Sequence, residues 1–208
     1  MMDKLIYCLS EYSLWEIAKG NLPEAINFVV ETNYNRHQGE LPVYVREEVT
    51  TICDEESDYF HRSFFYALRD NCSQKIIGTI RVLQWDKNMM LPIQKKYAVD
   101  IEKLVTKEKS VVDAVWYIGR FAINSKVSNI SILKTLLVNG FHAAYSCENS
   151  ILLAELDKKL FDKLKLLNIC FSQVGDSQLD MGSETVPAYI LSRDLSLFQE
   201  KNKHLCYV

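Results

Sequence analysis

The sequence is poor in glycine and proline, with 7 and 4 residues in a chain of 208, and it has no Gly-rich or Ser-rich stretch of the kind that forms linkers. Nothing therefore divides the chain, and 48% hydrophobic residues suffice for a sizeable core. We expect one domain over 1–208, with N-terminal helices over 1–37, an acidic segment over 38–60 and a sheet core over 61–208.

Long apolar runs are absent too. No window approaches the roughly 18 uninterrupted apolar residues that a membrane-spanning helix needs. The first ten residues carry Asp3 and Lys4 before a short apolar run, which does not fit a secretory signal. We therefore expect a cytoplasmic protein with no integral membrane segment.

An excess of positive charge is also missing, because 24 Lys and Arg residues stand against 27 Asp and Glu residues, for a net charge of −3. Such a balance provides no broad basic surface for a phosphate backbone, so we expect no nucleic acid partner. The six cysteines include no Cys-x-x-Cys pair, and no histidine stands at zinc-ligand spacing. This pattern predicts reduced thiols and no metal site.

The hydrophobic pattern that is present predicts a mixed α+β order. Helices are expected over 13–19, after Pro23, and over 94–108, 128–145 and 158–167, and an acidic loop over 40–58. Strands are expected over 61–68 and 75–84, which form a hairpin, and over 111–123, 150–156, 169–174 and 186–192.

Two arginines lie within these strands. Arg81 shares one face of its strand with Thr79 and Leu83, because side chains alternate along a strand. Arg81 is thus an ionised side chain on a half-apolar strand. Arg120 directly follows Gly119, and a glycine inside a strand often marks a bulge or a close backbone approach.

Four short motifs accompany this order of elements, at Asp54 to Tyr59, Ile77 to Leu83, Gly119 to Ile123 and Gly182 to Leu191. The order of elements resembles the GNAT acyltransferase fold, and the motifs resemble those of one branch of it, the acyl-homoserine-lactone synthases and long-chain N-acyl amino acid synthases. Ile77 to Leu83 is similar to their Gly-x-x-Arg-Leu strand, and Gly119-Arg120-Phe121-Ala122-Ile123 to their Ser-Arg-Phe-Ala-Val strand. Asp54 to Tyr59 is similar to their acidic segment, and Gly182 to Leu191 to their C-terminal segment. The resemblance implies a mixed, mostly antiparallel sheet that splays after its fourth strand, with helices on both faces.

The loop after the Gly119 strand, Asn124 to Ser131, contains no glycine. GNAT members that use coenzyme A usually have a glycine-rich loop here, which cradles the pyrophosphate at a helix N-terminus. The departure favours the branch that takes its acyl group from acyl carrier protein. The expected phosphate and pantetheine end consists of Lys126, Ser128, Ile130 and Ser131.

The resemblance implies an N-acyltransferase that moves a long-chain acyl group from a carrier thioester to the amine of an amino acid or similar small acceptor. Acyl carrier protein or coenzyme A would carry the acyl group as co-substrate, and no tightly bound cofactor is expected. The backbone of Phe121, Ala122 and Ile123 would contact the donor arm by strand addition.

For the reacting amine, we expect Asp54, Glu55 or Asp58 to take the proton, and Arg81 and Arg120 to hold the acidic segment or a substrate carboxylate. The synthases usually carry Glu three residues before the second arginine, where this sequence has Tyr117. A neutral tyrosine, with an ordinary pKa near 10, is a poor base.

Two alternatives stay open. One is a small-acyl, coenzyme-A-dependent GNAT N-acetyltransferase, and the other is a non-catalytic module that binds an acyl ligand or a partner. Lysine-rich helix faces over 95–107 and 158–165 would suit docking to an acidic partner such as acyl carrier protein.

Overall fold

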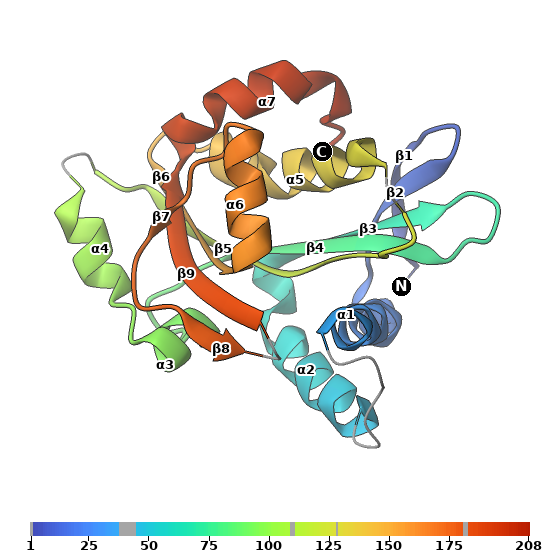
Figure 1. Cartoon of the computed structure of the whole chain (residues 1–208), viewed down its shortest axis with the longest axis horizontal. Coiled ribbons are helices and arrows are strands. Elements are labelled where there is room, and N and C mark those ends of the chain that lie inside the picture. Colours follow the sequence, from blue (N-terminus) through green and yellow to red (C-terminus); the bar gives the residue numbers. More distant parts are fainter. Residues whose placement is uncertain (1, 38–44, 109–110, 128, 181–182) are drawn as a thin grey trace.

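Nine strands of the described residues form one sheet in the order β1-β2-β3-β4-β5-β6-β9-β7, with β8 beside β9 (Figure 1). The computed structural model describes residues 2–37, 45–108, 111–127, 129–180 and 183–208. The neighbours β5 and β6 are parallel, and the other neighbouring pairs are antiparallel. The strands are β1 (Lys4–Cys8), β2 (Tyr12–Glu16), β3 (Ser63–Asp70), β4 (Ile76–Gln84), β5 (Ala114–Ile123), β6 (Ser150–Asp157), β7 (Ser172–Gln173), β8 (Gln178–Asp180) and β9 (Ser183–Leu191).

Helices cover both faces of the sheet (Figure 1). The central strand β6 shows why: Leu152, Ala154 and Leu156 pack among the helices of one face, and Ile151 and Leu153 pack on the other. A strand that is buried on both faces reads as an unbroken apolar run. On the face of Leu152 lie α5 (Ile130–Tyr145), α6 (Lys158–Leu166) and α7 (Ser196–Asn202), and on the face of Ile151 lie α1 (Leu22–His37), α2 (Val45–Tyr59), α3 (Pro92–Tyr97) and α4 (Ile101–Lys107).

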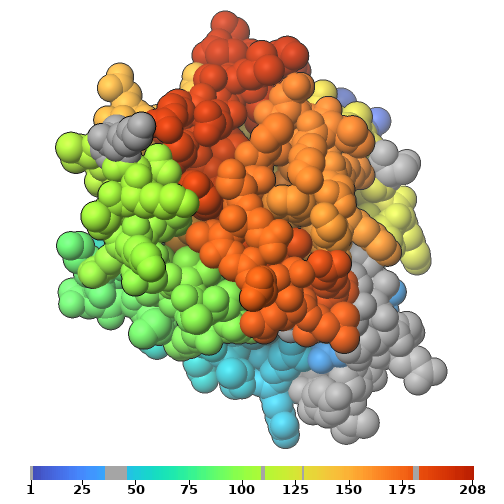
Figure 2. Space-filling view, turned by 60° about the vertical axis from the view of Figure 1, so that its left-hand side comes forward, coloured from blue at the N-terminus to red at the C-terminus, as the bar shows by residue number. Residues whose placement is uncertain are grey.

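The C-terminal strand β8 lies beside α3. Figure 2 shows this face, where the green α3 and α4 region lies beside the orange segment that carries β7 to β9. The side chain of Gln178 in β8 donates a hydrogen bond of 3.0 Å to the carbonyl oxygen of Lys96 at the end of α3. Because Gln178 is opposite Thr185, this contact places α3 near the start of β9.

The expected helix at 13–19 is wrong, because that segment contains β2, which pairs with β3 and with β1. Tyr12 and Leu14 point toward α5 in alternation with Ser13 and Trp15, a period of two that belongs to a strand. The described residues 2–37 therefore contain a β-hairpin followed by the long helix α1, rather than helices alone.

The expected acidic loop at 40–58 is also wrong over its described part, where α2 begins at Val45. Val49, Ile52 and Cys53 lie on one side of α2 and pack against the core beneath α1. The i, i+3, i+4 spacing of an amphipathic helix was present, but seven acidic side chains over the segment obscured it.

Two further differences concern helices. The expected helix at 94–108 is broken into α3 and α4 at Ala98, whose backbone is left-handed with φ 54°. Asp100 then caps α4 by accepting a hydrogen bond from the Lys103 amide. The C-terminal helix α7 was not expected. Within the described ranges, no helix combines the length and apolar character needed to cross a membrane.

Candidate active site

The parallel strands β5 and β6 separate halfway along their length. They pair from Ala114 opposite Ser150 to Ile118 opposite Ala154. Beyond that point, β5 continues only against β4 and β6 continues only against β9, within the part of the chain that the structure describes. The backbone of 119–123 thus has one edge without a strand neighbour among the described residues, at the strand where the sequence predicted an open edge.

A cleft of about 250 Å³ lies in this gap between β5 and β6. Its walls include Tyr117, Gly119 and Phe121 from β5 and Glu155 and Asp157 from β6. Residues of both helical layers reach it, namely Val29 and Asn33 of α1, Pro92 and Lys96 of α3, and Leu160 of α6. The cleft therefore passes through the sheet from one face to the other.

A β-bulge shapes the β5 wall. Arg120 and Phe121 together oppose the single residue Ile80, because the register shifts between the pairs at Thr79 and Arg81. Arg120 accommodates the extra residue by a left-handed backbone conformation, with φ 52°. As a result the Arg120 side chain reaches α2, while Phe121 packs toward the core beneath α5.

Both arginines bind one buried carboxylate, Glu56 of α2. The Arg81 Nε lies 3.2 Å from Glu56 Oε2, and the Arg120 Nε donates to Glu56 Oε1 at 2.8 Å. Arg81 and Glu56 each expose only 2% of their side chains. Arg81 also donates to the Tyr117 carbonyl oxygen at 3.1 Å, and its guanidinium lies 4.9 Å from the centre of the Tyr117 ring.

Burial alone would raise the pKa of Glu56, but the positive charges of Arg81 and Arg120 outweigh this effect and hold the pKa below its ordinary value. Glu56 is therefore ionised at neutral pH, and its single negative charge offsets one of the two positive charges of Arg81 and Arg120. Arg81 and Arg120 were expected to hold either the acidic segment or a substrate carboxylate. In the structure they hold Glu56, which belongs to the acidic segment.

The acidic residues expected to take a proton lie elsewhere. Asp54 and Asp58 are exposed on α2 and do not line the cleft. Glu55 is half exposed and lies 3.4 Å from the Arg120 Nη2. The sequence reasoning missed Glu56, although its position three residues after Cys53 and four after Ile52 placed it on the apolar side of a helix.

Tyr117 contacts a second carboxylate that the sequence reasoning did not identify. Its hydroxyl donates a hydrogen bond of 2.6 Å to Oε1 of Glu155 on β6. Burial and the negative charge of Glu155 raise the pKa of Tyr117 well above its ordinary value, so the hydroxyl keeps its proton. Lys96 approaches the other oxygen of Glu155, at 3.9 Å.

A second cavity of about 440 Å³ continues from the cleft on the α5 and α6 side, and the two share Phe121, Asp157 and Leu160. It is lined by Ile130 at the start of α5 and by Lys159 and Lys163 of α6. Positive charge and a helix N-terminus thus meet at this end, an arrangement that favours an anion.

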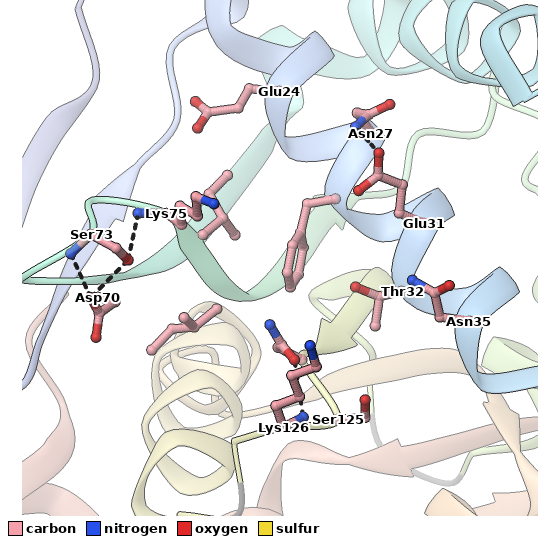
Figure 3. A pocket seen from close by; sticks show the side chains of 14 residues that line it. Glu24, Asn27, Glu31, Thr32, Asn35, Asp70, Ser73, Lys75, Ser125 and Lys126 are labelled. Atoms are coloured by element: carbon pink, nitrogen blue, oxygen red, sulfur yellow. Dashed lines mark hydrogen bonds between the residues drawn. The ribbon is translucent and has the colours of Figure 1, made fainter. Parts of the chain in front are cut away.

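The residues expected along the donor arm and at its phosphate end are only partly brought together here. Of the donor-arm residues, Phe121 and Ile123 line the second cavity and Ala122 is buried opposite Thr79, and of the phosphate-end residues, Ile130 lines this cavity. Lys126 instead lines a separate cavity of about 750 Å³ between α1 and the turn after β3 (Figure 3). The Ser131 hydroxyl lies 3.0 Å from the Tyr12 hydroxyl, and Ser128 falls outside the described residues.

Among the described residues, no cluster of His, Cys, Asp and Glu side chains is arranged to hold a metal ion. The six cysteines are free thiols. The chemistry of the cleft thus depends on three groups of residues. They are Glu56 with Arg81 and Arg120, the Tyr117 and Glu155 pair, and the lysines of α6.

The sequence matches no known protein family profile. It also matches no curated protein. Among solved structures, the chain is similar to FeeM, an N-acyl amino acid synthase from uncultured soil microbes, with 17% identity, TM-score 0.63, and coverage of 91% of this chain and 97% of FeeM.

Two other solved structures show the same likeness. One is BjaI, a coenzyme-A-dependent acyl-homoserine lactone synthase, with 11% identity, TM-score 0.54, and coverage of 88% of this chain and 82% of BjaI. The other is FdhC, a nucleotide-linked sugar GNAT, with 10% identity, TM-score 0.55, and coverage of 94% of each chain. The resemblance expected from the sequence is confirmed for the fold: this chain has the GNAT fold, and its structural neighbours include an N-acyl amino acid synthase and an acyl-homoserine lactone synthase.

Proposed function

We propose that the chain is an N-acyltransferase that binds a pantetheine thioester in the gap between β5 and β6 and passes its acyl group to a small amine. One observation carries this proposal: the cleft crosses the sheet along the backbone edge of 119–123. An arm that contains amide groups can add to such an edge as an extra strand, with backbone hydrogen bonds to hold it.

The two ends of the cleft differ in the way the reaction requires. On the side of α5 and α6 the cleft continues into the second cavity, where Lys159 and Lys163 suit the phosphate of a pantetheine arm. The end toward α3 carries Glu155 and Lys96, which suit an amine and its proton. Donor and acceptor would therefore enter from opposite faces of the sheet and meet beside Gly119.

The reaction is an acyl transfer. The amine nitrogen attacks the thioester carbonyl carbon, the C–N bond forms, and the C–S bond breaks with its electron pair on sulfur. The nitrogen loses a proton and the leaving thiol gains one. Backbone N–H groups of the open β5 edge would donate to the carbonyl oxygen as it becomes negative.

We propose a long-chain acyl group, acyl carrier protein as the donor and an amino acid as the acceptor. Support comes from the glycine-free segment 124–131 and from the structural likeness to FeeM. The test is mass spectrometry of lipid extracts from cells that overproduce the chain. A new N-acylated amino acid is expected. A folded protein with an unchanged lipid profile would instead favour the non-catalytic binding module.

The lysines of α6 offer a prediction about the donor. The double variant Lys159→Glu and Lys163→Glu is expected to lower kcat/KM for the acyl carrier donor by about 10-fold or more at low salt, because it reverses the charge where the phosphate would enter. The wild-type rate should fall as salt is added, and the rate of the variant should respond less.

The matched control is the double variant Lys158→Glu and Lys165→Glu. These lysines lie on the same helix, do not line the second cavity, and pair with Asp162 at 3.2 Å. The control changes the net charge equally and should retain most of the rate. Equal losses in both double variants would mean that general surface charge, and not this cavity, attracts the donor.

A further inference from the structure

We propose that Glu155 is the proton acceptor for the attacking amine and that Tyr117 positions it. This inference rests on the proposed acyl transfer and names the residue that the sequence left unidentified. The main observation is the 2.6 Å hydrogen bond from the Tyr117 hydroxyl to Glu155 Oε1 at the wall of the cleft. Tyr117 stands where the synthases that the sequence resembles usually carry Glu, and it donates to a carboxylate of the neighbouring strand.

The strand geometry places this pair where the sheet opens. Tyr117 is opposite Leu153, one residue before the last pair between β5 and β6. Glu155 lies two residues beyond Leu153 and so points to the same face of β6. The carboxylate therefore stands just past the splay point, across the gap from Gly119, where the thioester carbonyl would lie.

Comparison of the carboxylates around the cleft singles out Glu155. Among the described residues that line the cleft, the carboxylates are Glu155 and Asp157. Asp157 caps α6, with its Oδ1 accepting hydrogen bonds from the amides of Lys159 at 2.9 Å and Leu160 at 3.2 Å. Glu56 is enclosed by two arginines and is 2% exposed, so an amine cannot reach it.

The groups around Glu155 provide a hydrogen-bond donor and positive charge for its carboxylate. The Tyr117 hydroxyl donates to one oxygen, and the Lys96 ammonium lies 3.9 Å from the other. Arg81 and Arg120 add positive charge behind Tyr117, and Asp157 adds negative charge farther along β6. Glu155 is partly accessible, with 13% of its side chain exposed.

In the proposed step, the amine nitrogen uses its lone pair to form the C–N bond, and Glu155 takes the proton that this nitrogen loses. The sulfur leaves with the C–S electron pair. The proton on Glu155 then passes to the thiolate, which restores the carboxylate and releases a thiol. Tyr117 keeps its own proton throughout and holds the carboxylate in place.

The variant Glu155→Gln tests the role directly, because glutamine has the same shape and still accepts a hydrogen bond from Tyr117. With medium- and long-chain acyl carrier thioesters and a mixture of the twenty amino acids, we expect kcat to fall about 100-fold or more. The KM for the donor should remain unchanged. Glu184→Gln is the matched control, since Glu184 lies on β9, is exposed and does not line the cleft.

The variant Tyr117→Phe tests the positioning role by its pH profile. Loss of the hydroxyl removes a hydrogen bond that favours the ionised carboxylate, so the acidic limb of kcat/KM should move to higher pH. A residue with a purely structural role would lower the rate without moving this limb. If Glu155→Gln does not fold, this profile decides alone, and an unmoved limb overturns the proposal.

The outcomes separate this inference from the proposed function. If the wild-type protein forms no N-acyl product, the proposed function fails and the base assignment fails with it. If the wild type is active and folded Glu155→Gln retains its kcat within a factor of about three, acyl transfer stands and Glu155 is not the base. A deep loss in Glu155→Gln, with a shifted limb in Tyr117→Phe, supports both.

Discussion

Replacing Glu56 by alanine is expected to lower the free energy of unfolding by about 3–5 kcal/mol, the range found when one partner of a buried ion pair is removed. Arg81 exposes 2% of its side chain and would keep its charge without its partner Glu56. Arg120 would lose its 2.8 Å contact as well, and its contact to Glu55 is longer, at 3.4 Å. Urea unfolding at neutral pH measures the difference.

Glu55→Ala is the control for this experiment, because it removes the neighbouring carboxylate from the same turn of α2. Glu55 is half exposed and makes a single contact of 3.4 Å with Arg120. An exposed pair of this kind contributes about 0–1 kcal/mol. A loss in Glu56→Ala no greater than in Glu55→Ala would show that the buried arginines find other partners, and that Glu56 does not hold α2 to the sheet.

Replacing Gly119 by alanine is expected to lower the free energy of unfolding by about 1–3 kcal/mol, as overpacking of a well-filled interior does. A Cβ atom at this position would lie 2.7 Å from the Arg81 Nη2. The guanidinium cannot withdraw easily, because Glu56 and the Tyr117 carbonyl oxygen hold it in place. The measurement is again urea unfolding, with acyl transfer as a second readout.

Gly20→Ala is the matched control, since a Cβ atom at Gly20 would meet nothing within 4 Å. This variant should leave stability within about 0.5 kcal/mol of the wild type. Should Gly119→Ala be as stable as Gly20→Ala, Arg81 must be free to move, and the close packing of β4 and β5 would not explain the glycine.

The sequence predicted the central part of the fold well. The hairpin of β3 and β4, the strand β5 with its glycine and arginine, and the run from α5 through β6 to α6 follow hydrophobic periods that tertiary packing reinforces. Their order also predicted the GNAT fold. The hairpin of β1 and β2 was predicted wrongly because strands this short show little of the alternating pattern. The helix α2 was predicted wrongly because its many acidic residues hide its apolar positions.

The candidate site was predicted less completely, for a physical reason. Arg81 and Arg120 stand out in a sequence because they interrupt apolar strands. Glu56 and Glu155 lie 64 and 38 residues away from their partners Arg120 and Tyr117. Which carboxylate of an acidic run is buried, and which strand lies across a gap, depends on tertiary contacts that local patterns do not encode.

The close packing of Gly119 on Arg81 has a consequence for how this chain can diverge. In this chain a side chain at 119 would have to displace the Arg81 guanidinium, which Glu56 holds, so a homologue with a side chain at 119 needs a different position of that guanidinium. The residue at 119 should therefore vary with the way in which positions 56 and 81 pair across homologues. Covariation among these three columns, more than identity at any one of them, would identify sequences that share this architecture of the cleft.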